Sequence, residues 1–144
     1  MEQPYVTAAL LCERVLIEKD GTLSLVRIVD RIQYRIEGEG LPKDIRPIIN
    51  IQGVVSLKSG PATGDHTIKI VIERPNGERK EVVLFPAKLL GKDQGVNLVL
   101  NINLSIDQDG LHWFDVLFDD GLLLTRIPLM VMPLQKEAQP GQLP

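Results

Sequence analysis

The chain has 144 residues, of which 44% are hydrophobic and 24% are charged, and a net charge of −3; this is the size and composition of one globular domain. So mild a negative charge offers no basic surface for nucleic acid or for a membrane, and we expect neither as a partner. The single cysteine, Cys12, excludes an intramolecular disulfide and a zinc site made of cysteines. Because the chain shows neither a secretory signal nor an apolar run of the ~20 residues that a membrane helix needs, we expect a cytoplasmic protein.

The first half of the chain predicts strands, with one ambiguity at its start. Residues 5–19 fit either a strand or the apolar stripe of a helix, and we favour a strand because Asp20-Gly21 turns directly into another strand-like run. Residues 22–32 are apolar on both faces, which is typical of one central strand. Residues 46–58 alternate, with an apolar face formed by Ile49, Ile51, Val55 and Leu57.

The second half alternates more clearly. Residues 65–74 and 80–85 read as a hairpin around Asn76-Gly77, two residues that tolerate positive φ. Residues 95–107 show a strict period of two, and residues 110–118 and 122–132 flank a turn at residues 119–121. Breaks are expected at residues 37–42, 59–64 and 86–95, where Gly and Pro gather.

These strands follow one another without intervening helices, which predicts an all-β, two-sheet antiparallel sandwich of about eight strands, immunoglobulin-like or C2-like in topology. We expect residues 1–134 to form a single domain and residues 135–144 to form a flexible tail.

Several short motifs resemble a bacterial family of small β-sandwich domains of unknown function. The opening of that family reads L-C-D, a Gly turn and S-L-x-G-I-F-D-x-I, and its later strands begin G-D-H and G-x-Y-x-F-x-V. The matching residues here are Leu11, Cys12, Ser24, Leu25, Ile28, Asp30, Ile32, Gly64, Asp65, His66, Gly110, Phe114 and Val116. Glu13, Arg27, Val29 and His112 depart from the pattern. The resemblance implies a sandwich and assigns no activity.

Candidate catalytic groups are few. His66, beside Asp65, and His112, near Asp115, would form a hydrolase or small-ligand site only if they converged in a cleft. No nucleophile motif surrounds either histidine, and we interpret both as structural. The acidic turns at residues 107–110 and 119–121 offer too few ligands each for calcium, so we expect neither metal nor cofactor.

The last predicted hairpin is the more informative feature. If Phe114, Val116 and Phe118 point inward, the opposite face is apolar where an isolated sandwich would be polar. That face would carry Trp113, Leu117, Leu122, Leu124, Met130 and Met132. Either a loop at residues 86–95 covers this face or a partner docks on it, and the sequence leaves the two alternatives open.

We therefore interpret the chain as a non-catalytic β-sandwich module for protein interaction or assembly, with a protein partner or self-association and no enzymatic activity. The alternative is a hydrolase or ligand-binding domain that uses Asp65, His66, His112 and Asp115.

Overall fold

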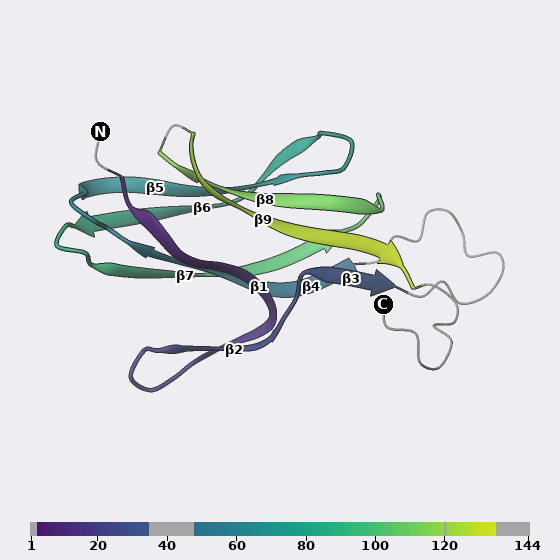
Figure 1. The fold of residues 1–144 in the computed structure, drawn as a ribbon, viewed down its shortest axis with the longest axis horizontal. Coiled ribbons are helices and arrows are strands. Elements are labelled where there is room, and N and C mark those ends of the chain that lie inside the picture. Colours follow the sequence, from purple (N-terminus) through teal and green to yellow (C-terminus); the bar gives the residue numbers. More distant parts are fainter. Residues whose placement is uncertain (1–2, 35–47, 120, 135–144) are drawn as a thin grey trace.

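The computed structural model describes residues 3–34, 48–119 and 121–134, and it confirms an all-β fold of two sheets packed face to face (Figure 1). Nine strands are described where about eight were expected. They are β1 Tyr5–Ile17, β2 Leu23–Ile28, β3 Arg31–Tyr34, β4 Ile48–Lys58, β5 Thr63–Glu73, β6 Arg79–Leu90, β7 Gly95–Ser105, β8 Gly110–Phe118 and β9 Leu122–Pro133. The four-stranded sheet has the order β2-β1-β4-β7, and the five-stranded sheet has the order β3-β9-β8-β5-β6.

The core lies between the two sheets and is built by the predicted alternation. β7 contributes Leu98, Leu100 and Ile102, while β8 contributes Phe114 and Phe118, all at most 8% exposed. Every second residue of these strands points to the same side, so one face of each strand is removed from water. The inward positions of Phe114, Val116 and Phe118 on β8 are confirmed, and β1 is a strand rather than a helix.

Residues 22–32 do not form the single central strand that was expected. They divide into β2, at an edge of the four-stranded sheet, and β3, which pairs in parallel with β9 in the other sheet. β2 ends at Ile28, directly after Arg27, whose φ of 54° is a left-handed conformation. Residues 22–32 are apolar on both faces because β2 and β3 belong to different sheets, and not because they form the middle strand of one sheet.

The break expected at residues 86–95 is also shorter than predicted. β6 continues through Pro86 to Leu90, and only residues 91–94 form the turn into β7. Pro86 is tolerated because β6 is an edge strand, where a missing backbone donor can face solvent. The other expected breaks fall on a turn at residues 59–62 and on residues 37–42, which lie outside the described part, as does the predicted tail.

β1 and β2 form a hairpin that reaches away from the sandwich (Figure 1). β1 pairs with β4 only as far as Cys12, and beyond that point it pairs with β2 alone. The hairpin exposes aliphatic side chains, among them Ile17 at 69% and Ile28 at 64%. β4, in contrast, pairs with β7 over its full length, so the last residues of β1 diverge from a strand that continues straight.

Candidate functional site

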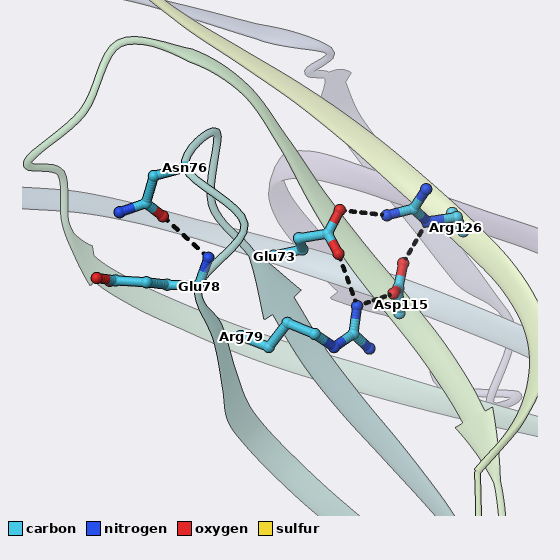
Figure 2. A network of polar contacts seen from close by, with 6 residues as sticks. All are labelled: Glu73, Asn76, Glu78, Arg79, Asp115 and Arg126. Carbon is cyan, nitrogen blue, oxygen red and sulfur yellow. Dashed lines mark hydrogen bonds and ion pairs between the residues drawn. The ribbon is translucent and has the colours of Figure 1, made fainter.

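The side of the five-stranded sheet that faces away from the other sheet, here called the outer face, carries a closed ring of four charged side chains (Figure 2). Arg79 Nη1 donates to Glu73 Oε1 at 2.9 Å and to Asp115 Oδ2 at 2.8 Å. Arg126 completes the ring, with Nε donating to Asp115 Oδ1 at 2.6 Å and Nη2 donating to Glu73 Oε2 at 2.8 Å. Two acids and two bases therefore neutralise one another.

Strand register places these groups side by side. The turn at Asn76-Gly77 sets Glu73 directly opposite Arg79, and Asn76 Oδ1 closes that turn by accepting from the backbone N–H of Glu78. The β8–β9 pairing sets Asp115 opposite Arg126. Side chains that face each other across antiparallel strands on one face are in contact distance.

The ring is anchored by its most buried member. The Asp115 side chain is 5% exposed, and a carboxylate removed from water is retained only if its oxygens are hydrogen-bonded. Hydrogen bonds from Arg79 and then Arg126 hold the pKa of Glu73 below its ordinary value. The pKa of both guanidinium groups is raised in turn, above all by the hydrogen bond to Asp115.

Trp113 lies next to the charged ring and under Arg126. The guanidinium carbon of Arg126 is 4.5 Å from the centroid of the Trp113 side-chain ring. That distance is a cation–π contact. Leu117 shares the face with Trp113 and is half-buried, and the strongly exposed apolar neighbours are Leu84 at 50% and Leu123 at 49%. The outer face thus joins one tryptophan, one stacked arginine and exposed leucines.

Two of the residues expected on this face have other positions. A register shift in the β8–β9 pairing leaves Leu124 between the pairs of Leu123 and Thr125, and Leu124 packs against the core. Leu123 instead lies opposite Leu117 on the outer face. A bulge adds one residue to one strand and so reverses the faces beyond it, which simple alternation does not anticipate. Leu122 is 44% exposed opposite Phe118, the inward-facing end of β8.

The two methionines lie at the far edge of the outer face, where β9 meets β3. Met130 pairs with Arg31 and Met132 pairs with Gln33, and both methionines are half-buried. The segment suspected of covering the outer face does not do so, because residues 86–90 belong to β6 and Leu89 is 1% exposed in the core. Within the described ranges, no loop covers the outer face.

His66, a member of the alternative site, is held at both ring nitrogens. Nδ1 donates to Asp119 Oδ2 at 2.8 Å and Nε2 donates to the Thr63 carbonyl at 2.8 Å. These acceptors, Asp119 first, raise the pKa of His66 and favour the imidazolium. Burial acts to raise the pKa of Asp119, but hydrogen bonds from His66 and from the Thr67 N–H outweigh it and the pKa is lowered. Neither ring nitrogen is free to take a proton from a substrate.

His112 is separate from this pair. It is 1% exposed, and its Nδ1 donates to the Gly110 carbonyl at 3.1 Å, while burial lowers the pKa of the ring and keeps it neutral. His66 stacks on Phe118, the last residue of β8, whereas His112 lies near the start of that strand. At about 3.3 Å per residue the two histidines are on the order of 20–25 Å apart.

The remaining predicted site residues do not complete a cleft either. Asp65 is exposed opposite Lys88, and Asp115 belongs to the charged ring on the outer face, whereas His112 is buried beneath the sheet. The hydrolase alternative requires these groups to converge, and the structure does not bring them together. Among the described residues, no three His, Cys, Asp or Glu side chains are grouped as a metal site would need.

Comparisons with known proteins add a fold and a family. No curated protein matches this sequence. A solved structure, that of Pseudomonas fluorescens alkylpurine DNA glycosylase AlkC bound to DNA containing an abasic site analog, matches 91% of the chain with a TM-score of 0.50 and 11% sequence identity. The chain spans about a third of that protein's length, 31%, so the similarity concerns the sandwich fold alone.

This similarity corrects the partner prediction, which excluded nucleic acid on the basis of net charge. A sandwich of this fold forms part of a protein whose structure was solved bound to DNA. The exclusion of nucleic acid as a partner is therefore wrong. Net charge describes the whole chain and does not describe what one face of a sheet contacts.

In the part of the chain that the structure describes, no helix is long and apolar enough to cross a membrane.

The sequence itself matches a family model over residues 7–132, from the third residue of β1 almost to the end of β9. That model carries no activity, and the bacterial origin that the motifs suggested stays a prediction. The chain belongs to the family of unknown function DUF6941.

Proposed function

We propose that this chain is a non-catalytic interaction module that docks another protein on the outer face of its five-stranded sheet. The observation that carries the proposal is Trp113 stacked under Arg126, beside exposed leucines, on a face that no described loop covers. Tryptophan and arginine are the side chains that most often dominate the binding energy of protein interfaces.

The charged ring supports this proposal through rigidity. Arg126 is fixed by Asp115 and Glu73 before any partner arrives, so ordering it on binding costs little further entropy. The ring is also electrically balanced, so the face presents an apolar platform rather than a strongly charged one. A partner of matching shape would therefore gain mainly from covering Trp113, Leu117 and Leu123.

The test is site-specific cross-linking in cells that express the chain. A photoreactive amino acid at Leu123 should form adducts with a protein, and Trp113→Lys should abolish them. Ile17→Lys is the control, because it places the same charge on an exposed apolar site of the distant β1–β2 hairpin and should leave the adducts unchanged.

Thermal melting must show that Trp113→Lys is folded; if it is not, Met130→Lys at the rim replaces it. The proposal is overturned if adducts persist in the folded variant or if none form in the wild-type chain. A DNA oligonucleotide that binds the purified chain through Trp113, measured by fluorescence anisotropy, would also overturn it.

A further inference from the structure

A groove lies on the other sheet, where β1 separates from β4. The two strands pair as far as Cys12 and Gln52, and β1 then continues into the projecting hairpin while β4 runs on beside β7 (Figure 1). The groove between them has a volume of about 560 Å³ and is lined by residues 13–15, 50–52 and 101–103. Along Ile48–Ile51, β4 has no strand on this edge among the described residues.

The groove is maintained by a side chain that replaces a strand contact. Gln52 Oε1 accepts from the backbone N–H of Val15 at 2.6 Å, and Gln52 Nε2 donates to Asn101 Oδ1 at 2.7 Å. Val15 is therefore held away from β4 by the length of one glutamine, and its donor is satisfied. The separation of β1 from β4 is thus a stabilised feature of the fold.

Two asparagines in the groove have no such structural role. Asn50 and Asn103 face each other across β4 and β7, both exposed, and neither side chain has a hydrogen bond within the described residues. Asparagine is unfavourable in strands. The other asparagines of β7 compensate by bonding to neighbours, Asn97 to Ser56 and Asn101 to Gln52. Residues that break a local rule without structural gain are expected at functional positions.

Arg14 supplies a positive charge to the same groove. Its neighbour Glu13 is engaged by Arg27 at 3.4 Å, and across the described part of the chain no carboxylate forms an ion pair with Arg14. An unpaired guanidinium presents a planar set of donors that matches a carboxylate. Within residues 3–34, 48–119 and 121–134, the groove therefore combines an open strand edge, two amides without hydrogen bonds and one cation without an ion pair.

We propose that this groove binds an extended, acidic peptide segment of a partner protein, which adds to the Ile48–Ile51 edge of β4 and places a carboxylate on Arg14. The open edge selects an extended backbone, because alternate N–H and C=O groups of β4 lack a strand partner there among the described residues. Asn50 and Asn103 bond to the peptide, and Arg14 selects an acidic side chain. This site is independent of the outer face of the five-stranded sheet.

The experiment is a phage-display selection of short random peptides on the full chain, followed by titration of the selected peptide by NMR. Acidic sequences should be enriched, and the peptide should shift the amide signals of Ile48–Ile51. Affinity should fall at least tenfold in Arg14→Glu and severalfold in Asn50→Ala/Asn103→Ala. Lys80→Glu, a charge reversal on β6, should have no effect. Arg14→Gln serves if Arg14→Glu does not fold.

Three results would overturn the proposal. The selected peptides lack acidic residues or bind Arg14→Glu as tightly as the wild type. The shifted amides lie outside the groove. Sodium acetate alone, or a single-stranded oligonucleotide, reproduces the shifts at the same concentration as the peptide, which would indicate a simple anion site or a nucleic-acid site.

Discussion

Replacing Asp115 by asparagine tests whether the charged ring stabilises the five-stranded sheet. Asp115→Asn preserves the shape of the side chain but removes its charge and turns one acceptor oxygen into an amide donor. That donor faces a guanidinium donor of Arg79 or Arg126, so one hydrogen bond is lost and the other is weakened. Because the Asp115 side chain is 5% exposed, water cannot replace the lost partner from its side.

The expected loss follows from these contacts. Hydrogen bonds to charged groups contribute about 1.5–3 kcal/mol each. The arginine side chains are 43% and 35% exposed and can regain water, which favours the lower part of that range. We expect a loss of about 2 kcal/mol in the free energy of unfolding. At roughly 3–4 °C per kcal/mol for a domain of this length, the melting temperature should fall by about 6–8 °C.

Guanidinium unfolding followed by the fluorescence of Trp113, the only tryptophan, measures this loss directly. The matched control is Glu73→Gln, which breaks the same number of arginine contacts at a side chain that is 29% exposed and should cost clearly less. If Asp115→Asn unfolds at the wild-type denaturant concentration, or loses no more stability than Glu73→Gln, the ring does not depend on the buried carboxylate.

Two further predictions concern stability. The pKa of His66 is raised, so the stability that its charged form contributes should be full below pH 6.5 and be lost as pH rises through the higher pKa of the folded state. The pKa of Asp119 is lowered, so the stability that its carboxylate contributes should be present above pH 3.8 and be lost as pH falls through the lower pKa of the folded state. His66→Gln should flatten the alkaline decline in the denaturant midpoint, and an unchanged decline would contradict the assignment. Gly53→Ala should cost about 1–3 kcal/mol, because its Cβ would lie 3.1 Å from a Leu100 methyl in the core. Gly95→Ala, where the nearest atom is 3.6 Å away at the end of a lysine, should cost clearly less in the same denaturation assay.

Much of the fold was predictable because burial on one face imposes a period of two. That rule found β7 and β5 with small errors at the ends, whereas β6 continues to Leu90, five residues beyond its expected end. It failed at residues 22–32, where β2 and β3 are both apolar enough to read as one strand. Which sheet a strand joins depends on distant partners, here Met130–Pro133 for β3, and no local pattern reports that pairing.

The candidate site was predictable only in part. The positions of Trp113 and Leu117 follow from alternation along β8. The bulge at Leu124 interrupts the alternation along β9, and no pattern in the sequence near the turn reveals it. The charged ring was missed, although a signal was present. Asp115 is the one charged residue within an otherwise apolar strand, and such a residue predicts an oppositely charged partner nearby.

The parallel pairing of β3 with β9 has a consequence for how the chain is made. β3 is complete at Tyr34, but its partner ends only at Pro133, so on the ribosome β3 must wait for almost the whole described chain to be synthesised. The four-stranded sheet needs only residues up to Ser105 and can form first. We therefore expect a late docking step in which β9 inserts between β3 and β8, and slow closure of this kind is typical of pairings between distant segments.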